Sequence, residues 1–248
     1  FIQRSPYYLK VPKTLGDAKE AGIPSPMTWQ EMEACGTMSL AVVPNALPSK
    51  DVAGAKAAVA EAADSYLEIT KSRGYRVPIH YGSKNQAPWG SNSFVLNNLL
   101  VMGLAHDLTG ERRYLDGVVV GMDYLMGRNP MDQSYVTGYG ERPLVNPHHR
   151  FWSYQTNTKF PKAPPGVISG GPNSGLEDPY VQAAGLKGCA PEKCFVDNIE
   201  AWSANEITIN WNAPLVWVAA FLDEKGATPP AKSAAPAPAA KAKGKGKR

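Results

Sequence analysis

A single glutamate ahead of an apolar stretch is the first feature of this sequence that could perform chemistry. Glu206 follows Asn205 and precedes a run that contains isoleucine, tryptophan and proline. A carboxyl group in apolar surroundings holds its proton more tightly, which is the property that a general acid needs near neutral pH. The competing interpretation is an ordinary glutamate in the first turn of a helix, where the helix dipole favours the charged form. The residue types alone leave both interpretations open.

A second candidate group is the run His148, His149 and Arg150, which lies in a segment rich in aromatic residues such as Tyr139 and Trp152. Aromatic rings stack on the apolar faces of sugar rings, while arginine and histidine donate hydrogen bonds to hydroxyl groups. The combination therefore favours carbohydrate binding. One alternative is a loop held by its own hydrogen bonds. A metal site is the other, although adjacent histidines do not easily converge on one ion.

Several other kinds of site lack their sequence patterns. The chain has no glycine-rich phosphate-binding loop in the required context, no Gly-x-Ser-x-Gly elbow and no HExxH pair. Of the three cysteines, Cys189 and Cys194 are separated by a short segment that contains proline, and this spacing predicts a disulfide under oxidising conditions. Two free thiols are the alternative. Cys35 lies in an apolar segment and is expected to be a buried thiol.

The charge of the chain is unevenly distributed. The formal net charge is +4, but residues 225–248 carry seven Lys and Arg residues and no acidic residue, which leaves −3 for residues 1–224. The basic character therefore belongs to the end of the sequence and predicts no nucleic-acid partner for the folded part. No apolar run reaches the roughly 18 residues that a membrane-spanning helix needs.

Hydrophobic spacing predicts an all-α protein whose long loops carry the candidate residues. The expected helices cover residues 29–43, 93–108, 111–126 and 204–223, together with one that begins at a cap on Asp51 and stops at Gly74. The two helices around residue 110 have a short connection and should be antiparallel. Residues 130–200 show little periodicity, and a loop of that length is often functional. Residues 225–248, rich in Ala, Pro and Lys, read as a disordered tail or linker.

Three segments together resemble the signatures of family 9 glycoside hydrolases, which include cellulases. The first signature is similar to residues 123–150, which include the Pro-His-His-Arg run. The second is similar to residues 197–214, which include Asn205 and Glu206. Residues 89–93 also look similar to a family segment. The likeness extends over about residues 25–224.

The resemblance implies the C-terminal part of an (α/α)6 barrel, with an open cleft for cellulose or a related β-glucan at one end. It implies a secreted, monomeric hydrolase that cleaves internal β-1,4 bonds with inversion. Glu206 matches the general acid. The substrate-binding positions implied are His148, His149, Arg150, Trp89, Trp211 and Tyr139. Family members often bind structural calcium, for which this sequence offers no evident ligand set; the hydrolysis itself needs no cofactor.

One departure from the family pattern concerns the second carboxylate. An inverting glycosidase needs a base roughly 6.5–9.5 Å from its acid, and the upstream aspartate segment that supplies it in the family has no counterpart here. Twelve barrel helices of about 12 residues each, with loops, also need more than roughly 300 residues. We therefore expect residues 1–224 to be a partial catalytic domain, with the base on an absent upstream segment. The alternatives are a non-catalytic glucan-binding remnant and a hydrolase of another β-glucan.

Overall fold

The computed structural model describes residues 17–18, 23–24, 27–28 and 32–227. Its elements in chain order are β1 (Asp17–Ala18), β2 (Ile23–Pro24), α2 (Glu33–Val42), α3 (Ser49–Ser72), η2 (Gly74–Arg76), α4 (Ser91–Thr109), α5 (Arg112–Leu125), α6 (Pro179–Ala183), η3 (Pro191–Lys193), α7 (Trp202–Asn205) and α8 (Ile209–Ala227). The two short strands pair in antiparallel fashion. Helices dominate the described residues.

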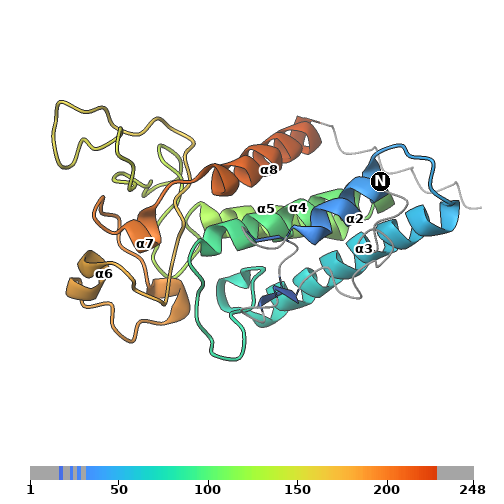
Figure 1. The fold of residues 1–248 in the computed structure, drawn as a ribbon, viewed down its shortest axis with the longest axis horizontal. Helices are drawn as coiled ribbons and strands as arrows, with labels where there is room; N and C mark the ends of the chain where they lie inside the picture. Colours follow the sequence, from blue (N-terminus) through green and yellow to red (C-terminus); the bar gives the residue numbers. More distant parts are fainter. Residues whose placement is uncertain (1–16, 19–22, 25–26, 29–31, 228–248) are drawn as a thin grey trace, which may run out of the picture.

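The long helices pack around α4, which contacts α3, α5 and α8. Figure 1 shows these helices side by side along the longest axis of the molecule. Most residues of α4 are buried, including its serines and asparagines, so this helix forms the centre of the described core. Small residues allow the close approach: a Cβ on Gly117 of α5 would lie 2.6 Å from Leu67 and 2.8 Å from the sulfur of Met102. This helical layer is a rigid support for the loops.

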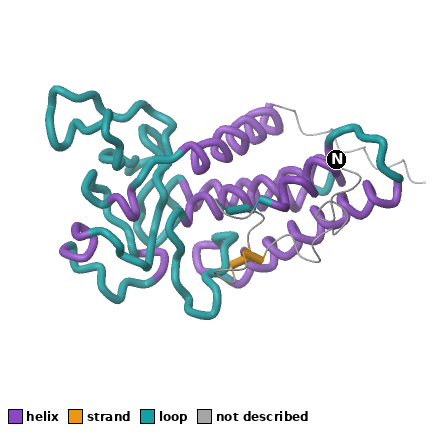
Figure 2. The backbone as a smooth tube through the Cα atoms, in the orientation of Figure 1, coloured by secondary structure: helices purple, strands orange, loops and turns teal. Residues whose placement is uncertain are grey.

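Long loops gather at one end of the helical layer, together with α6 and α7 (Figure 2). They come from residues 77–90 and 126–208, which are far apart in the sequence. Isolated backbone bridges join parts of the second segment, namely Val136 with Ile168, Thr137 with Leu144 and His148 with Glu206. The Ser174 N–H donates to the carbonyl oxygen of Ala87 at 2.9 Å, which links the two segments. The loops therefore form a hydrogen-bonded structure of their own, which holds the residues identified as candidates for chemistry.

The structure confirms the antiparallel helix pair and corrects several boundaries. The connection between α4 and α5 is two residues long, Gly110 and Glu111. Helix α3 begins at Ser49 rather than at a cap on Asp51, and no side chain caps it. The first expected helix begins at Glu33 in the described part, whereas residues 29–31 lie outside the described residues.

The last helix differs most from the prediction. It begins at Ile209 instead of residue 204 and continues to Ala227, beyond the expected end at 223. The separate short helix α7 precedes it, because the backbone around residue 206 bonds to neighbouring loops instead of continuing the helix. The expected tail beyond residue 227 lies outside the described residues. No helix in the described part is both long enough and apolar enough to cross a bilayer.

The cysteine predictions have mixed outcomes. Cys189 and Cys194 form the expected disulfide, with their Cα atoms 5.4 Å apart. The expectation of a buried Cys35 is wrong, since this thiol is only half-buried. Its sulfur lies 3.0 Å from the sulfur of Met27. Partial burial raises the pKa of Cys35.

A buried polar cluster anchors the disulfide loop to the helical layer. Glu192, inside the loop, accepts a hydrogen bond from the guanidinium of Arg73 at 3.1 Å, and both side chains are largely buried. The Arg73 guanidinium also lies 4.6 Å from the centre of the Tyr81 ring. Side-chain hydrogen bonds connect Tyr81 to Glu192 and to Tyr124. Burial raises the pKa of Glu192, and the bonds from Arg73 and Tyr81 oppose this rise.

Replacing Arg73 by alanine should destabilise the fold by about 3 kcal/mol at neutral pH, because it leaves the Glu192 charge buried and unpaired. A raised pKa in the folded state means that the folded protein binds more protons, so stability falls as pH rises above the ordinary glutamate range. The deficit of the Arg73→Ala variant should therefore shrink in acid, where Glu192 is protonated. Urea unfolding at neutral and acidic pH measures both effects.

Lys71→Ala provides the matched control, since the Lys71–Glu68 pair is 65% and 70% exposed. Its removal should change the free energy of unfolding by less than about 0.5 kcal/mol. Equal effects of the two substitutions would contradict the anchoring role of the buried pair.

Candidate active site

Glu206 lies in an extended segment between α7 and α8, with φ −61° and ψ 150°. The expectation that it opens the final helix is therefore wrong. Two loops bond to this segment. The His148 N–H donates to the carbonyl oxygen of Asn205 at 2.8 Å, and the Gly170 N–H donates to the carbonyl oxygen of Glu206 at 3.0 Å. Two different loops therefore hold the backbone at consecutive carbonyl groups, one at the end of α7 and one at Glu206 itself.

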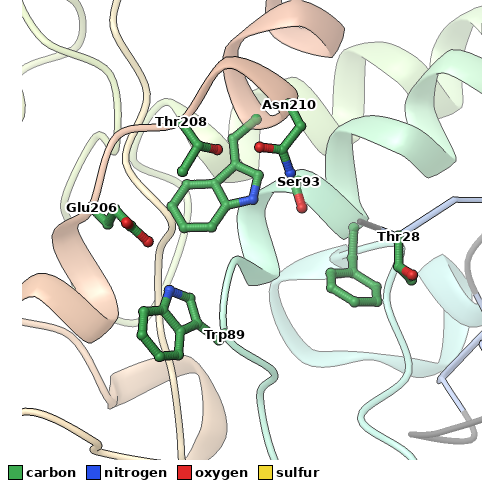
Figure 3. Close-up of a pocket in the computed structure, with 8 residues that line it drawn as sticks. Thr28, Trp89, Ser93, Glu206, Thr208 and Asn210 are labelled. Atoms are coloured by element: carbon green, nitrogen blue, oxygen red, sulfur yellow. The ribbon is translucent and has the colours of Figure 1, made fainter. Parts of the chain in front are cut away.

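The Glu206 carboxyl group lines a pocket of about 320 Å³, a volume at the lower end of small-molecule sites. Figure 3 shows Glu206 and Trp89 at one end of this pocket and Thr28 at the other. The described lining consists of Thr28, Trp89, Ser93, Phe94, Glu206, Thr208, Asn210 and Trp211. Glu206 is the only ionisable residue among these described lining residues. Aromatic faces, hydroxyl groups and one carboxyl group suit an uncharged polar ligand.

Trp211 lines the pocket but is almost buried, with 7% of its surface exposed. Two glycines lie against its ring. A Cβ on Gly90 would be 2.9 Å from the indole, and a Cβ on Gly170 would be 2.7 Å from it. Gly90 also has a positive φ of 76°, which glycine adopts readily. Trp211 thus forms a fixed wall of the pocket beside the acid. Its ring fits there because Gly90 and Gly170 have no Cβ atom.

Trp89 is the more accessible aromatic residue, with 39% of its surface exposed. It directly precedes Gly90 at the start of α4. Its ring packs against Trp202 of α7, with centroids 5.4 Å apart and planes inclined by 37°. The sequence reasoning selected Trp89 and Trp211 but missed Trp202. The one signal in the sequence was the position of Trp202, four residues before Glu206. This position indicates a place near the site only when α7 is known to form.

His148 is brought directly beside the acid, because its backbone bridges to Glu206. Its side chain is half-buried, and its Nδ1 lies 2.5 Å from the carbonyl oxygen of Ile199. A carbonyl oxygen can only accept, so Nδ1 carries the proton. With its proton on Nδ1, the imidazole can use Nε2 as a hydrogen-bond acceptor.

The other residues selected from this loop have no backbone bridge to Glu206 and, like His148, are not among the described lining residues. The His149 ring stacks on Trp152 at 4.1 Å between centroids, and its Nδ1 accepts from two backbone N–H groups of its own loop. Burial, and secondly the neighbouring His148, lower the pKa of His149. Arg150 and Tyr139 are exposed. None of the three is among the described residues that line the Glu206 pocket.

Asp197 holds the loop that carries His148. Its two carboxylate oxygens accept hydrogen bonds from the backbone N–H groups of Val145 and Asn146, each at 2.8 Å. The side chain of Asn205, next to the acid, donates to the carbonyl oxygen of Asn146 at 2.6 Å. Asp197 is thus a structural partner of the site, whereas the nearby Glu200 is exposed.

A structural calcium ion finds no evident site in the part of the chain that the structure describes. No group of three or more His, Cys, Asp or Glu side chains there is arranged to hold a metal ion. The structural calcium that the family resemblance allows stays a prediction.

Comparisons with known proteins agree with this fold and site. Residues 4–219 match the family model for glycosyl hydrolase family 9. The chain is 51% identical over 231 residues to a cellulose 1,4-beta-cellobiosidase of Acetivibrio thermocellus, with coverage of 90% of this chain and 26% of that protein. It is 42% identical over 208 residues to endoglucanase C of Cellulomonas fimi, with coverage of 83% and 19%.

Solved structures give the same picture. A metagenome-derived family 9 endoglucanase superposes with a TM-score of 0.69 at 28% identity, over 80% of this chain and 34% of that chain. A single mutant of a thermostable endoglucanase from Alicyclobacillus acidocaldarius gives a TM-score of 0.66 at 30% identity, over 75% and 34%.

These similarities define an all-α protein with part of an (α/α)6 barrel and a loop-built site at one end of its helices. The predicted fold class, the C-terminal part of such a barrel, is confirmed. The chain belongs to glycosyl hydrolase family 9. It spans 26% of the length of the cellobiosidase that it resembles and about a third of the solved endoglucanases.

The wall formed by Trp211 gives a direct test of the pocket geometry. In a Gly170→Ala variant, the new methyl group meets the Trp211 ring and should displace it, at a cost of about 1–3 kcal/mol. Tryptophan fluorescence and urea unfolding report the displacement and its cost. Gly74→Ala is the control, because nothing lies within 4 Å of a Cβ at that position. Unchanged fluorescence and stability in the Gly170→Ala variant would contradict the described packing.

Proposed function

We propose that this chain contributes the proton-donating side of an active site that hydrolyses internal β-1,4-glucosidic bonds in cellulose or a related β-glucan. The observation that carries the proposal is the position of Glu206, the only ionisable group among the described lining residues of a pocket that also contains Trp89. Membership of glycosyl hydrolase family 9 supplies the reaction class.

In this proposal Glu206 donates a proton to the glycosidic oxygen as the bond to the sugar breaks. The step requires the carboxyl group in its neutral form. The described lining residues of the pocket include no cationic side chain that would pair with the carboxylate form. The backbone bonds from both loops fix the direction of the side chain. Trp89 offers a partly exposed face to a sugar ring, and the free Nε2 of His148 can accept a hydrogen bond from a sugar hydroxyl.

Hydrolysis with inversion requires a second carboxylate that activates water on the opposite face of the sugar. No second carboxylate is among the described residues of the pocket lining. In this proposal the base is therefore a carboxylate other than the described residues that line this pocket, and its identity stays a prediction. A glucan-binding remnant without a base would keep the same aromatic and histidine residues, so turnover separates these two possibilities.

The choice of glucan is a separate question. One relative, 33% identical over 162 residues, is a xyloglucan-specific endo-beta-1,4-glucanase of Bacteroides ovatus. This similarity favours a branched β-glucan as the second candidate substrate, and a substrate panel distinguishes it from cellulose. We further propose a secreted protein, because the Cys189–Cys194 disulfide suits oxidising surroundings. The proposal of a monomer rests on the family resemblance alone.

The Glu206→Gln substitution tests the proposed function. In the complete catalytic domain it should lower the release of reducing sugar from phosphoric-acid-swollen cellulose by about 10²–10⁴-fold, the usual contribution of a general acid. Glu200→Gln is the matched control, since it removes an exposed carboxylate six positions before Glu206, on the other side of α7. The control should retain its turnover. Turnover close to that of the unmodified enzyme in the Glu206→Gln variant would exclude the assigned role.

A further inference from the structure

The Trp89–Trp202 pair connects the pocket to α7, the short helix that ends at the acid. Trp89 belongs to a loop without regular structure, and 39% of its surface is exposed. The contact with Trp202, at 5.4 Å between centroids, falls within the range in which aromatic pairs attract. Trp202 itself is half-buried and is not among the described residues that line the pocket. It therefore lies behind the accessible ring.

The helix that carries Trp202 is firmly held although it contains only four residues. The buried carboxylate of Asp178 accepts hydrogen bonds from the backbone N–H and the hydroxyl group of Ser203, at 2.9 and 2.6 Å. The side chain of Asn173 donates to the Ser203 carbonyl oxygen at 2.8 Å. Trp202 precedes Ser203 directly, so its backbone position is fixed by three bonds to its neighbour.

We infer that Trp202 is a positioning residue that holds the Trp89 ring in place for stacking on a sugar of the bound glucan. The inference rests on the proposed function, because it assumes that the Glu206 pocket binds a glucan chain. Its physical basis is entropic. A tryptophan on a loop has several side-chain conformations in the absence of a packing partner, and the ligand must then fix one of them on binding. The packed Trp202 ring removes that cost beforehand.

The consequence is a specific effect on affinity. Loss of the Trp202 ring should weaken glucan binding by about 3- to 10-fold, the cost of immobilising one large side chain. The effect should require Trp89. A purely structural role for Trp202 would act through α7 and Glu206, and it would persist whether Trp89 is present or absent.

A double-mutant cycle separates these roles. The complete catalytic domain with Glu206→Gln serves as the parent, because it should bind cellohexaose without consuming it. Calorimetric titration with cellohexaose gives Kd for the parent and for Trp89→Ala, Trp202→Ala and the double variant. Trp202→Phe is the conservative variant that keeps a ring. Urea unfolding of each protein shows that the variants are folded.

The inference predicts that Trp202→Ala raises Kd by about 3- to 10-fold, that Trp202→Phe restores most of the affinity, and that the double variant binds like Trp89→Ala alone. Additive effects of the two alanine substitutions, or an unchanged Kd in the Trp202→Ala variant, would overturn it. A Trp202→Ala variant that fails to fold, combined with a Trp202→Phe variant that binds poorly, would also overturn it. A parent that does not bind cellohexaose would reject the proposed function itself, and this inference with it.

Discussion

The backbone at residues 204–206 is the constraint on which the site depends. Three consecutive carbonyl oxygens there accept hydrogen bonds from two separate loops. One loop donates from Gly171 to Ala204 and from Gly170 to Glu206. The other donates from His148 to Asn205. Carbonyl oxygens that are bonded to other loops are not available to the N–H groups of a following helical turn, so α8 begins only at Ile209. The acidic side chain is therefore fixed by loop pairing, and this explains why a proposed catalytic glutamate lies between two helices instead of within one.

The loops that provide these bonds are themselves held by buried charges rather than by regular structure. Asp197 binds the backbone ahead of His148, and Asp178 binds the start of α7. Glu192, inside the disulfide loop, pairs with Arg73 at the end of α3. Each carboxylate satisfies several donors at once, which offsets the cost of removing its charge from water. The helical layer around α4 then supplies the rigid base on which these loops rest.

The sequence was sufficient for the helices whose apolar residues follow a helical period, such as α4 and α5, and for the short-range disulfide. It also identified Glu206, His148, Trp89 and Trp211, all of which lie at or next to one site. It failed where long-range contacts decide the structure. The start of the final helix was misplaced because pairing with the loop at Gly170 overrides local helical tendency, and Trp202 was missed because its partner Trp89 is more than a hundred positions away.

The assignment of Glu206 as the general acid is tested most directly by comparing the effect of Glu206→Gln on substrates with different leaving groups. A natural glucan needs a proton on its departing oxygen, whereas dinitrophenolate departs without one. In the complete catalytic domain, Glu206→Gln should therefore lose about 10²–10⁴-fold in kcat/KM on cellohexaose but less than about tenfold on 2,4-dinitrophenyl β-cellobioside. Equal losses on both substrates would mean that Glu206 binds or orients the sugar, and would contradict its assignment as the general acid.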